Sequence, residues 1–352
     1  MPIRIPDALP ATDLLAAENI FVMTEYRAMH QDIRSLRVVL VNLMPTKVAT
    51  ETQILRKLSN TPLQVQVTLL RMGSHDAKHG SAQHLDTFYR VFEDIADEHF
   101  DGMIITGAPV EHLEFEEVDY WDELCALMDW SQSHVHSILH ICWGALAGIY
   151  HHYDVGKRAL PAKLTGVFEH RLVKPTSPLL RGFDDRFLAP HSRFSGVALE
   201  EVEAAPTLEV LALSDEAGLY AAKSVNSRNF FVFGHPEYDR LTLAEEYARD
   251  REAGVEGTLP AHYFPGDNPA AEPADLWCAH AQLLYTNWLN YYVYQTTPYD
   301  VRNAGDGMES AATSTGQPGS TPVRLQNEDD DGYDPWSDRR EATPAFEPDP
   351  WD

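Results

Sequence analysis

The chain contains few cysteines and no long apolar run. Its 352 residues include only three cysteines, Cys125, Cys142 and Cys278. Because this number is odd and the spacing is wide, the sequence predicts neither a disulfide framework nor a CxxC metal site. The N-terminal residues do not resemble a signal peptide, and no apolar stretch is long enough to cross a bilayer. These features predict a cytoplasmic protein.

Positive charge is scarce as well. The chain carries 27 Lys and Arg against 54 Asp and Glu, which gives a formal charge of -27 at pH 7. Binding of nucleic acids or of anionic membranes through bulk electrostatics requires the opposite sign. We therefore expect neither a nucleic acid nor a membrane among the partners of this protein.

The C-terminal end differs in composition from the rest of the chain. Residues 301–352 are rich in Gly, Ser, Thr, Pro and Asp, and they hold twelve acidic but only four basic residues. They show no helical or strand period, and their aromatic residues are scattered. Such a segment cannot bury enough apolar surface to fold. The sequence therefore predicts one domain over residues 1–300, followed by an acidic disordered tail over residues 301–352.

Upstream of the tail, strand-like and helix-like segments alternate. The apolar run LRVVLVNLM over residues 36–44 predicts a buried strand, and residues 46–60 predict a helix with one apolar face. Further strands are predicted over residues 63–72, 103–106, 137–141, 166–172, 207–213 and 229–233, and further helices over residues 84–99 and 120–130. This alternation predicts an α/β sandwich with a largely parallel central sheet.

One stretch has the pattern of a strand, a tight turn and a helix. In residues 137–148, SILHICWGALAG, a short apolar run is followed at once by Cys142 and then by an Ala/Leu-rich helical pattern. Such a turn exposes a nucleophile and leaves backbone N–H groups beside it to hold an oxyanion. The helix N-terminus would favour the thiolate. By itself the pattern also fits a structural cysteine, since free cysteine is among the most buried residue types.

A second candidate group follows the strand predicted over residues 229–233. The sequence continues as GHPEYD, so His235 lies between a glycine and a proline at the carboxyl end of a buried strand. Glu237 is close enough in sequence to orient the imidazole and to stabilise its charge. Ligand crevices of open α/β sheets form at such strand ends. Cys142, His235 and Glu237 are therefore a candidate nucleophile, base and orienting acid.

Two motifs around these residues, HICWGALAG and FGHPEYD, resemble the homoserine O-acyltransferases of bacterial methionine biosynthesis. The resemblance continues through MPIRIP, VNLMPTKVATETQ, LSNTPLQV, ITGAPVEHLEFEEVDYW, LRGFDDRFLAPHSR and NWLNYYVYQTTPYD. It covers almost all of residues 1–301 and leaves out only the acidic tail. It implies a fold like that of the class I glutamine amidotransferases, and it makes residues 1–300 an acyltransferase domain.

The resemblance implies a catalytic role for three positions. Cys142 matches the acyl-accepting nucleophile, His235 the general base and Glu237 the orienting acid. In the implied reaction the Cys142 thiolate attacks an acyl-CoA, while backbone N–H groups near Val110 and Trp143 hold the oxyanion. After CoA leaves, His235 takes the proton of the homoserine γ-hydroxyl as that oxygen attacks the acyl-cysteine. Because a covalent intermediate separates the two half-reactions, the expected kinetics are ping-pong.

Three further positions match substrate-binding residues of the family. They are Lys163 in ALPAKLTGVFEH, Ser192 in APHSR and Arg249 in EEYARDREAG. A homoserine site needs a cation for the α-carboxylate, and a guanidinium offers bidentate geometry. Without the resemblance, Lys163 and Arg249 would be interpreted as ordinary surface charges.

Position 111 bears on the acyl donor, because the family carries either glycine or glutamate there and this chain has Glu111. Succinyl-CoA has a distal carboxylate that acetyl-CoA lacks. Two unit charges about 4 Å apart repel by about 4 kcal/mol at an effective dielectric constant near 20. We therefore predict acetyl-CoA as the co-substrate, with Glu111 and Ser192 as specificity residues. Succinyl transfer is the alternative, and a Glu111 that points into solvent would weaken the preference.

Two interpretations from other classes stay open. A glutamine amidohydrolase shares the fold and a Cys/His/Glu site, but it needs a synthetase partner, and no synthetase domain or nucleotide-binding loop follows in this sequence. A non-catalytic protein of this fold would instead sense redox state through a low pKa of Cys142.

The expected partners are the small molecules L-homoserine and acetyl-CoA. The sequence predicts no other cofactor and no metal site, because His151 and His152 are adjacent but lack a ligand cluster. The aromatic segment over residues 277–294, WCAHAQLLYTNWLNYYVY, predicts a core element, with a homodimer interface as the alternative.

Overall fold

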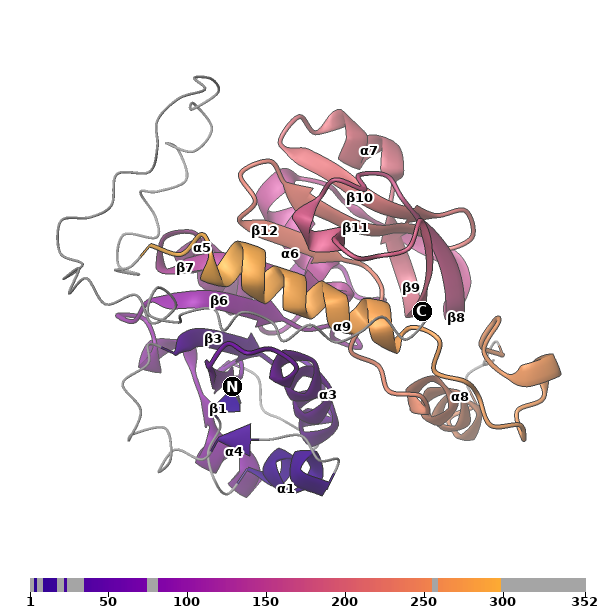
Figure 1. Cartoon of the computed structure of the whole chain (residues 1–352), viewed down its shortest axis with the longest axis horizontal. Helices are drawn as coiled ribbons and strands as arrows, with labels where there is room; N and C mark the ends of the chain where they lie inside the picture. Colours follow the sequence, from indigo (N-terminus) through magenta and orange to yellow (C-terminus); the bar gives the residue numbers. More distant parts are fainter. Residues whose placement is uncertain are drawn as a thin grey trace, which may run out of the picture. The chain divides into compact units, whose positions relative to one another are not determined.

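A mixed sheet of twelve strands forms the centre of the computed structural model (Figure 1). The structure describes residues 3–4, 9–17, 22–23, 35–74, 82–254 and 259–298. The strand order is β2-β1-β4-β3-β6-β7-β12-β11-β10-β8-β9, and β5 pairs with β4. The predicted acidic tail lies outside the described residues. Within those residues, no helix has both the length and the apolar character needed to cross a membrane.

The first half of the sheet is parallel. Its main strands are β3 (Leu36–Val41), β4 (Val65–Leu70), β6 (Phe100–Ile105), β7 (Val135–Ile141) and β12 (Asn229–Val232). β4 pairs with β3, β3 with β6, β6 with β7 and β7 with β12. Three short strands extend this half beyond β4: β1 (Ile3–Arg4), β2 (Val22–Met23) and β5 (Tyr89–Arg90). The predicted α/β fold with a largely parallel sheet is confirmed.

The second half of the sheet is antiparallel. It consists of β8 (Lys157–Leu172), β9 (Arg186–Val197), β10 (Leu208–Ser214) and β11 (Gly218–Ser224). β11 joins it to the parallel half by pairing with β12. β8 and β9 form a long hairpin that is irregular between Ala159 and Leu164. The sequence interpretation predicted β10 and the last part of β8, but not β9 or β11.

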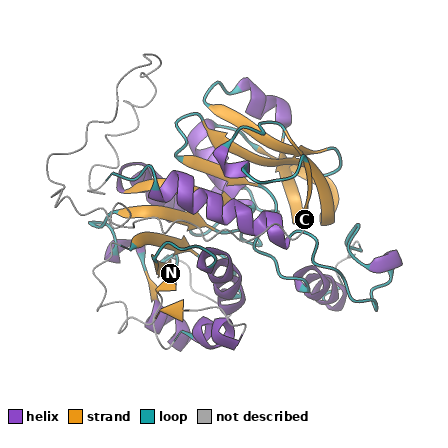
Figure 2. Cartoon of the chain, viewed as in Figure 1, coloured by secondary structure: helices purple, strands orange, loops and turns teal. Residues whose placement is uncertain are grey.

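Helices cover both faces of the parallel half (Figure 2). Alternate residues of β3 point to opposite faces: Val38 and Leu40 pack in one apolar cluster with α3 and α9, whereas Val39 and Val41 pack in another with α5 and α6. The helices are α1 (Pro10–Ala17), α3 (Lys47–Ser59), α4 (Ala82–Phe88), α5 (Trp121–His134), α6 (Trp143–Tyr153), α7 (Leu199–Ala204), α8 (Thr242–Glu252) and α9 (Cys278–Asn287).

The helix predicted over residues 84–99 is wrong in its second half. α4 ends at Phe88, and the next two residues pair with β4, Tyr89 opposite Leu69 and Arg90 opposite Leu70. The hydroxyl of Tyr89 is buried between α3 and the sheet, where Asn42 donates to it at 2.8 Å. This strand pairing outweighs the helical spacing of the apolar residues, which is a local signal only.

The aromatic segment over residues 277–294 lies in the core of the chain, as predicted. It forms α9 and a π-helix, Trp288–Tyr294, and α9 crosses in front of the sheet in Figure 1. Trp288 is fully buried, and its indole N–H donates to the hydroxyl of Ser137 on β7 at 2.9 Å. The segment therefore ties the end of the domain to the strand that carries Cys142.

Replacing Trp288 with alanine should lower the free energy of unfolding by about 3–5 kcal/mol, because it leaves a large cavity in the core. Tyr294 of the same π-helix is 53% exposed, and Tyr294→Ala should change the free energy by only about 0.5 kcal/mol. Urea unfolding of both variants measures the difference. Equal effects would contradict the core location of this segment.

Candidate active site

Cys142 lies in a strained turn between β7 and α6. Its backbone has φ 50° and ψ -115°, a region that residues other than glycine rarely adopt. The first N–H groups of α6 have no acceptor within the helix. A Cβ added at Gly144 would come within 2.6 Å of the carbonyl oxygen of Thr106, so glycine there lets the turn approach the end of β6. The predicted strand, turn and helix are therefore present.

The loop after β6 covers the sulfur. A Cβ added at Gly107 would lie 3.3 Å from Cβ of Cys142 and 3.6 Å from Cε1 of His235. Val110 follows in this loop, and Trp143 is the first residue of α6. Both expected oxyanion positions thus belong to the two segments that meet at Cys142. Their role stays a prediction.

His235 is fixed by its neighbours on three sides. Its backbone N–H donates to the carbonyl oxygen of Pro190 on β9 at 2.8 Å, and its ring stacks on Tyr238 with centroids 4.1 Å apart. Nδ1 lies 2.7 Å from Oε1 of Glu237. All three groups of the candidate constellation are buried, with Cys142 3%, His235 4% and Glu237 6% exposed. The structure therefore brings the predicted nucleophile, base and orienting acid together.

Burial and charge oppose each other in this constellation. Burial raises the pKa of the Cys142 thiol, and the charge and hydrogen bond of His235 act in the opposite direction. For His235, burial alone would lower the pKa, but the negative charges of Cys142 and Glu237 raise it well above the usual value. Imidazolium and thiolate thus stabilise each other in a site that is otherwise unfavourable to charge.

A cavity of about 490 Å³ opens over the sulfur. It is lined by Met44, Pro45, Thr46, Gly107, Ala108, Pro109, Glu111, His112, Cys142, Lys163, Ser192, Phe194, His235, Tyr238, Glu246, Arg249 and Asp250. Six sequence-predicted site residues are among them. Glu237 reaches the site through His235 instead. The size is in the range of small-molecule sites.

Glu111 points toward Cys142 and not into solvent. Oε1 accepts from the Cys142 thiol at 3.8 Å. Oε2 accepts from the backbone N–H of Phe194, from the N–H of Ser195 at 3.1 Å and from the Ser195 hydroxyl at 3.4 Å. Burial raises the pKa of Glu111, and these donors, together with the charges of His235 and Arg193, act against that rise. The carboxylate is thus held at the sulfur by the backbone of β9.

Lys163, Ser192 and Arg249 line the other side of the cavity, together with two acids of α8. Lys163 Nζ lies 2.6 Å from Oδ2 of Asp250 and 4.0 Å from Oε2 of Glu246. The Ser192 hydroxyl donates to Glu246 at 2.5 Å. Lys163 is therefore an ion-paired residue of the cavity and not a free surface charge. Both signs of charge are present, as the binding of a zwitterionic ligand requires.

Sequence interpretation did not single out Tyr238, Glu246 and Asp250. A signal existed for the two acids, because Glu246, Arg249 and Asp250 have the spacing of residues on one helix face. The Tyr238 hydroxyl donates to Oε1 of Glu246 at 2.7 Å, which joins the loop after β12 to α8. No comparable signal marks the N–H groups of β9, because they depend on a strand that was not predicted.

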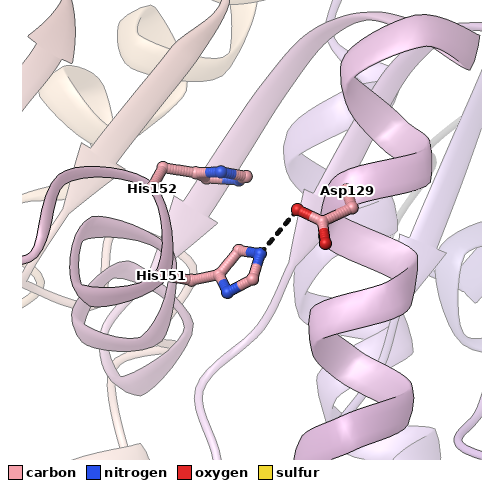
Figure 3. Close-up of side chains that lie close together, drawn as sticks. All are labelled: Asp129, His151 and His152. Atoms are coloured by element: carbon pink, nitrogen blue, oxygen red, sulfur yellow. Dashed lines mark hydrogen bonds and ion pairs between the residues drawn. The ribbon is translucent and has the colours of Figure 1, made fainter.

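Away from this cavity, the described residues include one cluster with groups that can bind metals (Figure 3). Asp129 of α5 lies beside His151 and His152 of α6, with the candidate ligand atoms within 4.8 Å of one another. His151 Nε2 is 2.7 Å from Asp129, and His152 Nε2 is 3.3 Å from Nε2 of Gln132. These contacts explain the cluster without an ion. The expectation of no metal site stays a prediction.

Comparison with known proteins places the chain among homoserine acyltransferases. The sequence pattern of the family "Homoserine O-succinyltransferase" matches residues 2–299. A homoserine O-acetyltransferase of Brevibacillus brevis is 55% identical over 303 residues, which is 86% of this chain and 99% of that protein. A homoserine O-succinyltransferase of Shewanella amazonensis is 55% identical over 301 residues, 86% of this chain and 95% of that protein. The two names occur at equal identity and so do not choose the acyl group.

Among solved structures, a glutamine amidotransferase of Thermotoga maritima covers 73% of this chain and 98% of its own, with 10% identity and a TM-score of 0.47. Identity this low speaks to the fold at most. The family assignment depends on the sequence matches alone.

His235→Asn should move the pH profile of Cys142 alkylation by iodoacetamide upward by about one unit or more. Only the thiolate reacts. Loss of the imidazolium removes an effect that lowers the thiol pKa, so a higher pH is needed for the same rate. Mass spectrometry of each cysteine gives the rates. The exposed Cys278 is the internal control and should not change. An unchanged Cys142 profile would contradict the proposed coupling.

Proposed function

The chain belongs to the homoserine O-succinyltransferase family, and we propose that it transfers an acetyl group from acetyl-CoA to the γ-hydroxyl of L-homoserine. The observation that carries this proposal is the grouping of Cys142, His235 and Glu237 at a cavity that also contains Lys163 and Arg249. Relatives named for acetyl or succinyl transfer support the acyltransferase class. The choice of acetyl depends on Glu111.

In the first half-reaction the Cys142 thiolate attacks the thioester carbonyl of acetyl-CoA. The oxyanion is held by backbone N–H groups of the loop after β6 and of the first turn of α6, near Val110 and Trp143. Collapse of the tetrahedral intermediate breaks the carbon–sulfur bond to CoA and leaves an acetyl group on Cys142. One thioester replaces another, so this step has little thermodynamic cost. CoA leaves as the thiol, with its proton supplied by His235.

In the second half-reaction homoserine attacks the acetyl-cysteine. His235, oriented by Glu237, takes the proton of the γ-hydroxyl as the oxygen bonds to the carbonyl carbon. The carbon–sulfur bond to Cys142 then breaks, and the thiolate is restored beside the imidazolium. Conversion of a thioester into an oxygen ester is downhill. The ester leaves as O-acetyl-L-homoserine.

The two ends of homoserine meet opposite charges. Arg249 and Lys163 supply cations for the α-carboxylate, and a guanidinium can bind it through two hydrogen bonds. Glu246 and Asp250 supply anions for the α-ammonium group. Because Lys163 is already paired with Asp250, the substrate carboxylate must share or displace that pairing.

Glu111 selects the donor by its charge. Its carboxylate is 3.8 Å from the sulfur that carries the acyl group, so a second carboxylate on the donor would lie close to it. Repulsion of about 4 kcal/mol at this range corresponds to a preference of several hundredfold for acetyl over succinyl. Succinyl transfer is the alternative, because relatives with that name are equally similar.

The test is CoA release by the purified protein with L-homoserine and either acetyl-CoA or succinyl-CoA. Acetyl-CoA should give the higher kcat/KM, and Cys142→Ala should lower turnover by at least roughly a thousandfold, as expected for loss of a nucleophile. Cys278→Ala, at an exposed cysteine outside the cavity lining, is the matched control and should stay active.

Turnover retained by Cys142→Ala would contradict the mechanism. A preference for succinyl-CoA would overturn the assignment of the donor and leave the acyltransferase class intact. If neither donor releases CoA, the acyltransferase proposal fails, and a glutaminase assay then tests the amidohydrolase alternative.

A further inference from the structure

The backbone of β9 offers unpaired donors beside Cys142 because the β8–β9 hairpin is irregular there. Ala159 pairs with Ser195, but the next pair is Leu164 with Arg193. Four residues of β8 therefore face one residue of β9, Phe194, and the regular ladder is interrupted. Buried N–H groups need an acceptor. The N–H groups of Phe194 and Ser195 both find it in Oε2 of Glu111, which comes from a different part of the chain.

The surroundings of these donors favour an anion. The Ser195 hydroxyl is a third donor to Oε2 at 3.4 Å, and Ser195 is 2% exposed. The guanidinium of Arg193 is buried behind them, where it donates to the carbonyl oxygens of Ser195 at 2.6 Å and of Ala217. A positive charge and three donors that converge on one oxygen are what a carboxylate site requires.

We propose that β9 forms a carboxylate-binding site of its own, made by the N–H groups of Phe194 and Ser195 and the Ser195 hydroxyl, and that Glu111 occupies it. The proposal rests on the acyltransferase function. Glu111 then excludes a dicarboxylic donor by filling the place that the donor's distal carboxylate would take, in addition to repelling it. When Glu111 is absent, the same donors bind that carboxylate.

The lengths of the acyl chains fit this site. Glu111 brings one carboxylate oxygen to 3.8 Å from the Cys142 sulfur and gives its other oxygen to the donors of β9. A succinyl group on the sulfur spans roughly 5 Å to its distal carboxyl carbon, with carbon–carbon bonds of about 1.5 Å. An acetyl group is too short to reach the donors. The site therefore separates acyl groups by the presence of a distal carboxylate.

Three variants separate occupation of the site from simple repulsion and from added room. Glu111→Gly empties the site and removes the charge. Glu111→Gln removes the charge but keeps an amide oxygen in the site. Ser195→Ala in the Glu111→Gly background removes one donor without changing the charge of the cavity. The kcat/KM for succinyl-CoA and for acetyl-CoA is measured for each.

Glu111→Gly should raise the ratio of succinyl-CoA to acetyl-CoA use by roughly a hundredfold or more. Glu111→Gln should gain less than about a tenth of that increase, because its side chain still fills the site. Adding Ser195→Ala to Glu111→Gly should lower succinyl-CoA use by roughly tenfold, since a hydrogen bond to a charged group is lost. Acetyl-CoA use should stay within about twofold, because the acetyl group does not touch this residue.

Equal gains for Glu111→Gln and Glu111→Gly would overturn the proposal in favour of repulsion alone. A Ser195→Ala change that leaves succinyl-CoA use unaffected would overturn it in favour of added room. Acylation of Cys142 without homoserine, followed by intact mass, repeats the comparison for the first half-reaction only. If Cys142 is acylated but homoserine accepts nothing, the proposed function fails while the carboxylate site is still tested.

Discussion

The parallel ladder between β7 and β12 sets the positions of the groups that would react. The backbone N–H of Cys142 donates to the carbonyl oxygen of Val232, the last residue of β12, at 2.8 Å. The two strands therefore end at the same level, and the chain continues from one into Cys142 and from the other into Gly234 and His235. Carboxyl ends of parallel strands are where open α/β sheets form their ligand crevices. The separation of the sulfur and the imidazole is thus set by backbone pairing, not by flexible side chains.

The antiparallel half of the sheet completes what the parallel half begins. β9 contributes the carbonyl oxygen of Pro190 that holds the backbone of His235, the hydroxyl of Ser192 that bonds to Glu246, and the N–H groups that hold Glu111. One strand thereby contacts the base, the acids of α8 and the donor-selecting carboxylate. The irregular pairing of β8 with β9 makes this reach possible, since a regular ladder would use those N–H groups for the sheet itself.

Much of this arrangement follows from local sequence. Buried parallel strands are continuous apolar runs, so β3, β6 and β7 were predictable, and the residues that end them are visible as Gly107 and Cys142. The second half of the helix predicted over residues 84–99 failed because Tyr89 joins an edge of the sheet, which no local pattern announces. β9 escaped prediction because Pro190, His191 and Arg193 interrupt its apolar alternation. The side chains of His191 and Arg193 are buried for contacts made across the fold.

Glu111 places donor selection and nucleophile activation in opposition. Its charge acts, with burial, to raise the pKa of the Cys142 thiol, whereas His235 acts to lower it. An anion this close to the sulfur should disfavour the thiolate that the reaction needs. The donors of β9 reduce the conflict, because they bind Oε2 and hold the pKa of Glu111 below the value that burial alone would give. A chain that keeps glutamate at this position therefore depends on β9 as much as on His235, since without those donors the buried carboxylate would have no partner for its charge except the groups that carry the chemistry.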